Sequence, residues 1–381
     1  MALSEIAKVP HGAPPKFIHQ NVSKVGIALS LLKAIAAGTG RAFVSPFKGS
    51  NGASTYFKDV ALAAFRTHLG NLNLAQDRYL FGTTSTPIYD QYCSSQKLTP
   101  SSITLPSGTQ AHWLGDKTAP KILVYLHGGG YVLPCTSGHI VWLHDLQKSL
   151  GPDVSALLLA YDMAPEHPYP TQLRQAVELL RYLTKSEGRN PADIIIGGDS
   201  AGGNLTIALL SHLAHPHPEI AELKLSGKIL AAMFISPWCS LTHNHTAAHT
   251  RNAERDVFDS RTLSRYAVAF LNSTSPFVGD VYTEPVLASA EWWEPVADVV
   301  EEVLIWGGEN EVLIDGIEAF ANKFSIGFRR NGGHVNVVIT KGAMHEEMIL
   351  ERILGYKGDT GTGSQAAVEE WVKARLQAGM N

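Results

Sequence analysis

The sequence predicts an α/β protein with a mostly parallel sheet, and two observations support this class. From residue 121 onward, short β-rich segments alternate with helical patterns, as they do when crossover helices join parallel strands. The segments are also apolar throughout, because strands covered on both faces have no solvated side. Core strands are therefore expected at residues 121–126, 156–161, 194–196, 229–235, 303–306 and 335–339.

Helices are expected on both faces of this sheet. One should begin at Thr171, after Pro170, because apolar residues recur there at helical spacing. The helix after Ser200 is apolar on nearly all sides, which is typical of a helix buried at the centre of a molecule. A further helix is expected from Ser364, with Trp371 in its buried stripe.

Two regions do not follow the alternation of strands and helices. They are roughly the first hundred residues and the segment 242–295, which is rich in His, Asn, Asp and aromatic residues. We interpret both as additions to a core. A helix is expected around residues 56–69 of the first region.

An apolar stretch at residues 25–37 is shorter than the roughly 18 residues needed to span a bilayer. Val25, Leu29, Leu32 and Ile35 recur there at helical spacing, which predicts a helix packed on its own protein. Peripheral contact of residues 25–37 with a membrane surface is the alternative.

The bulk composition excludes some classes of protein. The 381 residues suffice for one large α/β domain with extra segments or for two modest domains. A formal net charge of -4 provides no basic field, so a nucleic-acid partner is not expected. The three cysteines are widely spaced without a CxxC pair, which indicates neither a disulfide framework nor a zinc site. No secretory signal or targeting address is recognisable, so we expect an intracellular, cytoplasmic protein.

A glycine-flanked serine directly follows one predicted strand. The sequence Gly-Asp-Ser-Ala-Gly-Gly at residues 198–203 comes after the strand 194–196 and before the central helix. A nucleophilic serine must project from a sharp strand-to-helix turn, where only small neighbours fit. Ser200 is therefore the candidate nucleophile, although a glycine-rich turn that Ser200 only caps would show the same pattern.

A second motif favours the catalytic interpretation. The sequence His-Gly-Gly-Gly at residues 127–130 ends the strand 121–126. Ester hydrolysis passes through a tetrahedral oxyanion, and a preorganised backbone N–H group stabilises it by roughly 3 to 4 kcal/mol. Glycines let the chain approach that oxygen closely, and this motif is characteristic of lipases and esterases.

The base should follow the last strand, in a loop that brings its imidazole beside the serine. His345, within Gly-Ala-Met-His-Glu at residues 342–346, fits this position. The acid that orients it should follow the preceding strand, where Glu309, Glu311 and Asp315 are candidates. Glu311 is our choice, because Asp315 is expected to cap the following helix and Glu309 to be a solvated loop residue.

These motifs resemble the hormone-sensitive-lipase branch of the α/β-hydrolases over roughly residues 100–350. Besides residues 127–130 and 198–203, the sequence Tyr-Asp-Met-Ala-Pro-Glu-His-Pro-Tyr-Pro at residues 161–170 carries the resemblance. The chain is most similar to a fungal subgroup related to arylacetamide deacetylases, steryl acetyl hydrolases and esterases of secondary-metabolite pathways. That narrower similarity rests on short matches at residues 45–47, 58–59, 66–67, 236–238 and 292–293.

The resemblance implies an α/β-hydrolase fold with a mostly parallel sheet of eight strands. It also implies that Gly128, Gly129 and Ala201 supply the oxyanion amides. Residues 1–100 and the insertion 242–295 would form a helical cap over the core at 101–381. The family usually has Asp within a DxLxD pattern as the acid, whereas Glu311 occupies the first position here.

The predicted function is a serine carboxylic ester hydrolase, with Ser200, Glu311 and His345 as the triad. Its substrate would be a short-acyl ester, such as an acetate, of a hydrophobic metabolite or sterol-like alcohol. No cofactor or metal is expected, because backbone amides supply the electrophile. One alternative is acyl transfer through the same acyl-enzyme, or a non-hydrolytic reaction of a pathway enzyme on this scaffold. A non-catalytic ligand-binding protein is another. The sequence leaves the oligomeric state and the alcohol open.

Overall fold

The computed structural model describes residues 22–241, 246–272, 279–356 and 362–377. Within them, an eight-stranded sheet has the order β1-β2-β4-β3-β5-β6-β7-β8, which confirms the mostly parallel sheet. The first two strands are antiparallel to their neighbours, and all other pairs are parallel. The strands are β1 (Ser102–Thr104), β2 (Gln110–Leu114), β3 (Lys121–Leu126), β4 (Val154–Ala160), β5 (Ile194–Asp199), β6 (Ile229–Ile235), β7 (Val300–Gly308) and β8 (His334–Thr340).

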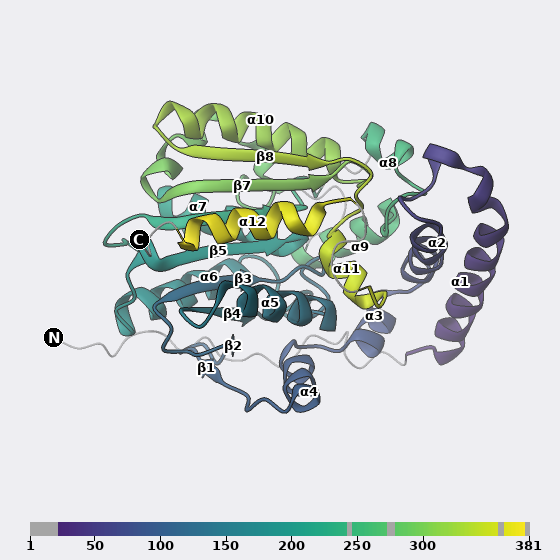
Figure 1. Ribbon diagram of the computed structural model, residues 1–381, viewed down its shortest axis with the longest axis horizontal. Helices are drawn as coiled ribbons and strands as arrows, with labels where there is room; N and C mark the ends of the chain where they lie inside the picture. Colours follow the sequence, from purple (N-terminus) through teal and green to yellow (C-terminus); the bar gives the residue numbers. More distant parts are fainter. Residues whose placement is uncertain (1–21, 242–245, 273–278, 357–361, 378–381) are drawn as a thin grey trace.

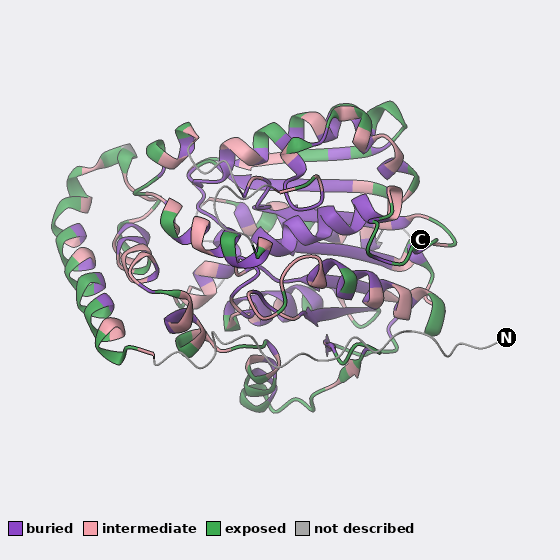
Figure 2. Ribbon diagram, turned by 180° about the vertical axis from the view of Figure 1, so that it is seen from behind, coloured by how far each residue is buried: buried purple, intermediate pink, exposed green. Residues whose placement is uncertain are grey.

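Helices cover both faces of the sheet, as predicted (Figure 1). Side chains of α5 (Ser137–Leu150), α11 (Glu347–Ile353) and α12 (Ser364–Gln377) belong to the core on one face. Those of α6 (Thr171–Arg181), α7 (Ser200–Ala214) and α10 (Ile314–Arg330) belong to the core on the other. The helix after Ser200 is buried along most of its length, and Figure 2 shows it among the buried strands.

The register of the parallel strands brings their carboxyl ends to one edge of the sheet. Leu126 at the end of β3 lies opposite Gly198 of β5, and Ile235 of β6 lies opposite Trp306 of β7. Gly308 of β7 pairs with Thr340 of β8. The loops that follow these five adjacent strands therefore meet, and each of them carries polar side chains described below.

Helices before Ser102 lie beyond this edge, at the right of Figure 1. The exception is α4 (Thr86–Gln96), which packs on α5 and β2. The helices beyond the edge are α1 (Lys24–Val44), α2 (Tyr56–Gly70) and α3 (Leu74–Phe81). Two short helices of the middle insertion, α8 (Ala247–Arg251) and α9 (Ser260–Leu271), lie beside them. Residues 1–21 of the expected cap, and 242–245 and 273–278 of the expected insertion, lie outside the described residues.

The predicted packing face of α1 is wrong. Val25 is 71% exposed and Leu32 is 61% exposed, and Leu29 and Ile35 are exposed with them. The face that packs on α2 is made of small and polar residues that include Ser30, Ala34, Gly38 and Arg41. Small side chains let two helices approach closely: a Cβ atom on Gly38 would lie 3.4 Å from the Ala64 methyl group. The larger apolar residues are left on the outer face, which is largely exposed in Figure 2.

The apolar segment is also longer than the sequence suggested. The helical segment Lys24–Phe47 is long and apolar enough to cross a membrane by length and composition alone. The apolar character continues past residue 37 because Phe43, Val44 and Phe47 follow, and all three are exposed. This helix differs from a core helix of similar composition in being mostly unburied.

Helix α2 is attached to the core by buried contacts. Leu62 and Leu69 form an apolar cluster with Val257 of the insertion and Met344 of the loop after β8. Lys58 is fully buried, and its Nζ lies 2.9 Å from Glu347 Oε1 and 2.5 Å from Glu351 Oε1 of α11. The N-terminal helices, the insertion and the loop after β8 thus pack together as one unit.

Candidate active site

Ser200 lies at a sharp turn between β5 and α7. Its φ of 50° is a left-handed conformation that side chains other than glycine rarely adopt. The neighbouring glycines are required by contact with the end of β3. A Cβ on Gly198 would lie 2.3 Å from the Leu126 carbonyl oxygen, and one on Gly202 only 1.9 Å from it. The strained turn that the motif predicts is therefore present. It packs closely on the end of β3, the strand that precedes the His-Gly-Gly-Gly motif.

The loop 127–130 is fixed by side chains around it. The His127 carbonyl accepts a hydrogen bond from Tyr161 Oη at 2.7 Å, and the His127 ring stacks on Tyr161. Nε2 of the His127 ring lies 2.9 Å from Ser85 Oγ. Burial lowers the pKa of His127 to about 3, so the imidazole is neutral and acts as a rigid support. Gly129 has a φ of 106°, and a Cβ there would lie 2.5 Å from the Leu133 carbonyl oxygen.

His345 and Glu311 form a buried pair at the ends of β8 and β7. Nδ1 of His345 lies 2.8 Å from Glu311 Oε2, and both side chains are fully buried. The other carboxylate oxygen, Oε1, accepts hydrogen bonds from Ser236 Oγ at 2.6 Å and from the Gly308 amide at 2.5 Å. Glu311 is thereby held in a single orientation toward the imidazole.

The other two acidic candidates point elsewhere. Glu309 is exposed and accepts a hydrogen bond from the Gly342 amide. Asp315, expected as a helix cap, instead lies within the first turn of α10, accepts from the Ala248 amide and pairs with Arg251. Of the three candidates, the structure brings only Glu311 to His345.

The backbone of His345 is held by a residue that the sequence did not indicate. Asp256 accepts from the His345 amide through Oδ1 at 3.2 Å and from the Val312 amide through Oδ2 at 2.7 Å. It therefore connects the two loops that carry the histidine and the acid. Ser236 was also missed as a functional residue: it bonds Glu311 and accepts from the Glu346 amide at 3.1 Å. Ser236 belongs to the short match at residues 236–238, but neither it nor Asp256 has a spacing that indicates contact with the histidine loop.

The second imidazole nitrogen has a different neighbour. Nε2 of His345 lies 3.3 Å from Glu346 Oε1 and has no hydrogen-bond partner among the described residues. A hydrogen bond to Ser200 Oγ is thus not formed in this structure; such bonds are often long before substrate binds. Burial disfavours the charged imidazole, but the carboxyl groups of Glu346 and Glu311 outweigh burial and raise the pKa of His345 above its ordinary value.

Side chains of the insertion cover these residues. The Phe258 ring meets the His345 imidazole edge to face at 5.3 Å, and Phe270 stacks on Tyr131 at 3.8 Å. A Cβ on Gly130 would lie 2.4 Å from the Tyr266 ring, which shows how closely α9 approaches the glycine loop. Ser200 itself is 5% exposed.

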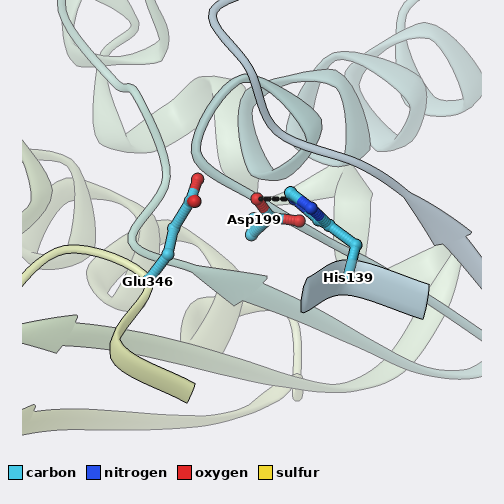
Figure 3. Close-up of side chains that lie close together, drawn as sticks. All are labelled: His139, Asp199 and Glu346. Atoms are coloured by element: carbon cyan, nitrogen blue, oxygen red, sulfur yellow. Dashed lines mark hydrogen bonds and ion pairs between the residues drawn. The ribbon is translucent and has the colours of Figure 1, made fainter. Parts of the chain in front are cut away.

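One group of side chains beside the pair could offer atoms to a cation. Donor atoms of His139, Asp199 and Glu346 all lie within 4.8 Å of one another, and Figure 3 shows the three side chains converging from different elements. Nε2 of His139 lies 3.0 Å from Asp199 Oδ2. The three residues are buried and were not singled out by the sequence.

Residues 123–349, more than half of the chain, match the model of a family described as alpha/beta hydrolase fold. The chain belongs to this family. The resemblance to hormone-sensitive-lipase-like esterases is confirmed by individual relatives of this α/β-hydrolase. This chain is 28% identical over 223 residues to the putative steryl acetyl hydrolase mug81 of Schizosaccharomyces pombe, and the match covers 56% of each chain. It is 33% identical over 158 residues to an acetyl-hydrolase of Streptomyces hygroscopicus, covering 41% of this chain and 48% of the relative.

These matches span about half the length of those two relatives. The crystal structure of an esterase from the bacterial hormone-sensitive lipase family has the same fold, with a TM-score of 0.59. That likeness covers 93% of this α/β-hydrolase and 100% of the other chain at 20% identity, so it supports the fold alone.

Proposed function

We propose that this α/β-hydrolase is a serine esterase that cleaves short-acyl esters, with Ser200 as nucleophile, His345 as general base and Glu311 as the orienting acid. The observation that carries the proposal is the 2.8 Å contact between His345 Nδ1 and Glu311, in loops at the same edge of the sheet as the strained serine turn. The nucleophile, base and acid follow β5, β8 and β7, whose carboxyl ends share one edge.

In the first half of the reaction, Ser200 Oγ attacks the carbonyl carbon of the ester and Nε2 of His345 accepts the serine proton. The developing oxyanion is placed against the amides of Gly128, Gly129 and Ala201, at the end of β3 and the start of α7. The tetrahedral intermediate collapses, the carbon–oxygen bond to the alcohol breaks, and His345 returns its proton to the leaving alkoxide. An acyl-Ser200 enzyme and a free alcohol result.

In the second half, His345 accepts a proton from water while the water oxygen attacks the acyl carbon. Collapse of this second intermediate releases the carboxylic acid, and the proton returns to Ser200. Glu311 fixes the tautomer with the proton on Nδ1, which leaves Nε2 free to act as base. It also stabilises the imidazolium that forms in each half.

The proposed substrate is an acetate or another short-acyl ester of a hydrophobic alcohol, such as a sterol or a fungal secondary metabolite. Support comes from the relatives, since two that match are named for acetyl hydrolysis. The covering aromatic side chains Phe258 and Tyr266 give the site an apolar roof. We propose that residues 1–100 and the insertion 242–295 act as the cap that selects the alcohol.

We also propose that the outer face of α1 contacts a lipid surface. Seven large apolar side chains of α1 are exposed, the helix has no acidic residue, and Lys24 and Lys33 are exposed on it. An exposed apolar face beside basic residues favours the interface of an anionic bilayer. The protein would remain intracellular, where a reducing environment suits its three buried, free cysteines.

The proposal is tested with the purified protein on p-nitrophenyl acetate, butyrate and longer esters, beside a matched anilide. We expect rapid cleavage of the acetate, and we expect an organophosphate to label Ser200, as read by peptide mass spectrometry. Ser200→Ala should remove labelling and reduce kcat/KM by roughly 10³-fold or more without loss of the fold. Turnover by the variant near the unsubstituted rate would refute Ser200 as the nucleophile.

A further inference from the structure

The residue before the nucleophile, Asp199, has a carboxylate held by two hydrogen-bond donors. Tyr125 Oη donates to Oδ1 at 2.6 Å, and His139 Nε2 lies 3.0 Å from Oδ2. Asp199 is fully buried, as are both of these partners to within a few per cent. The ionised form of Asp199 is therefore well stabilised although no solvent reaches it.

The hydrogen bonds of His139 decide which proton it carries. Its Nδ1 accepts a hydrogen bond from the Thr136 backbone amide at 3.0 Å. A backbone N–H can only donate, so Nδ1 is unprotonated and the ring proton lies on Nε2, facing Asp199. An imidazole with its proton on Nε2 donates to the carboxylate and offers no lone pair to a metal ion. Of the three side chains in Figure 3, His139 and Asp199 therefore form a hydrogen-bonded pair, which argues against a cation between them.

Glu346 is the third member, and it contacts the machinery on two sides. Its Oε1 lies 3.3 Å from Nε2 of His345, and a Cβ on Gly128 would lie 2.5 Å from that same oxygen. The residue has a φ of 46° and is 6% exposed, so the backbone and the packing both hold it inward. Its other neighbour is the carboxyl group of Asp199: one oxygen of each residue lies within 4.8 Å of the other, and a Cβ on Gly128 would lie 2.1 Å from Asp199 Oδ2 as well.

We propose that Glu346 is a positioning residue for His345: its carboxyl group shares one proton with Asp199, and the location of that proton decides whether a neutral or an anionic group faces Nε2. This inference rests on the proposed esterase function. Two carboxyl groups this close in a buried site do not both ionise readily. Asp199 already has two donors, so the shared proton resides on Glu346.

Titratable groups from several elements lie near Glu346. They are His345 on its own loop, Asp199 at the end of β5, His139 on α5, Tyr125 on β3 and Tyr161 after β4. Glu311 after β7 and Asp256 before α9 contact His345 in turn. Burial, with Asp199 adding to it, raises the pKa of Glu346 to about 7. His345 is the group among them that carries positive charge when protonated and directly faces Glu346.

The consequence for catalysis follows from the coupling of these two groups. When pH rises through neutrality, Glu346 ionises beside a protonated His345, and the new anion stabilises the imidazolium. His345 then keeps its proton to a higher pH than Glu311 alone would impose. Because only neutral imidazole accepts the serine proton, the acid limb of the pH–rate profile should lie at higher pH than in a chain without this carboxyl.

Glu346→Gln tests this prediction, because the amide keeps the size and can donate to Asp199 as the protonated acid does. The acid limb of kcat/KM on p-nitrophenyl acetate should move to lower pH by about one unit. Glu309→Gln is the matched control, since Glu309 is an exposed carboxylate near the same loops, and its profile should match the unsubstituted protein. Profiles of Glu346→Gln and the unsubstituted protein that superimpose would refute the proposal.

A readout independent of turnover separates this inference from the esterase assignment. The imidazole of His345 can be titrated by NMR after histidine is labelled with ¹³C, with His345→Gln assigning its signal. Glu346→Gln should lower the pH at which His345 titrates, and an unchanged value would refute the inference even if esters are cleaved. Glu346→Gly removes the same carboxyl at a position whose φ of 46° suits glycine. It should shift the titration in the same direction if Glu346→Gln folds poorly.

Discussion

The loops at the strand ends and helix α1 are built in different ways. At the strand ends, Glu311 makes three hydrogen bonds or ion-pair contacts within 2.8 Å, and each reacting group is positioned by the register of the sheet. On α1, the packing face consists of small residues, and the large apolar residues face outward. The positions of the strand-end residues follow from the order of the strands, so they can be inferred from the order of the motifs. A helix that is held only by side-chain contacts can pack on its neighbour with either face.

The largest effect should come from the acid at the strand ends. Glu311→Gln keeps the shape but can no longer fix the His345 tautomer, so kcat should fall roughly 10³–10⁴-fold. Glu309→Gln and Asp315→Asn should stay within about threefold, because neither carboxylate reaches His345. The measurement is kcat on p-nitrophenyl acetate for the three variants. Asp315→Asn as the most damaging of them would overturn the assignment of the acid.

A second prediction concerns the buried ion pairs that attach α2, on which α1 packs, to α11. Lys58→Met leaves Glu347 and Glu351 buried without their lysine, which should lower the free energy of unfolding by about 3 kcal/mol. Lys33→Met on the exposed side of α1 is the control and should change stability by less than about 0.5 kcal/mol. Urea denaturation followed by circular dichroism measures both. Equal stability of the two variants would show that α2 is not anchored through this lysine.

The pH dependence of stability should reveal the carboxyl beside His345. Glu346 has a folded-state pKa of about 7 against an ordinary value of 4.5. The native state therefore binds more protons than the unfolded state between these values, and stability falls as pH rises through that range. Glu346→Gln removes this loss, so its advantage over the unsubstituted protein should grow from pH 4.5 to pH 7, reaching roughly 2–3 kcal/mol.

Thermal or urea unfolding of both proteins at pH 5, 6, 7 and 8 would measure this difference. A difference in the free energy of unfolding between the two proteins that stays constant across the pH series would contradict the shared proton. A difference in the free energy of unfolding that becomes smaller as pH rises would show that Glu346 is stabilised as an anion.

The smallest effect is expected on the outer face of α1. Leu32→Glu places a charge on the exposed apolar face and should reduce sedimentation with anionic liposomes, while hydrolysis of a soluble acetate stays unchanged. Ile326→Glu, at an exposed apolar residue on α10, is the matched control and should leave liposome binding intact. Equal binding by both variants would remove the lipid-contact proposal.

The sequence predicted the parts of the site that follow from backbone order. Ser200, His345 and Glu311 each lie in a segment that follows a parallel strand, so their location at one edge of the sheet follows from the strand order. Asp256 could not be found this way, because it comes from the irregular insertion and reaches His345 through a tertiary contact. Glu346 is adjacent to His345 in the sequence, but no periodicity predicts its left-handed backbone conformation. Its proximity to Asp199 could therefore not be predicted.

The prediction for α1 failed for a physical reason. Apolar spacing predicts a helix but does not say which side has a partner. Here Ala34 and Gly38 allow a close approach to α2 that bulky leucines would prevent. The small residues of α1 therefore face α2, and its large apolar side chains remain exposed on the opposite face.

The positive φ of Ser200 means that the molecule is not at its most stable with serine in this position. A non-glycine residue in the left-handed region costs about 1 kcal/mol relative to glycine, which would adopt it freely. The surrounding contacts of Leu126 with the flanking glycines hold the turn in place against that cost. Under the proposed mechanism, thermostability and activity are therefore opposed at this one residue, because glycine would stabilise the turn but lacks the hydroxyl group of the nucleophile.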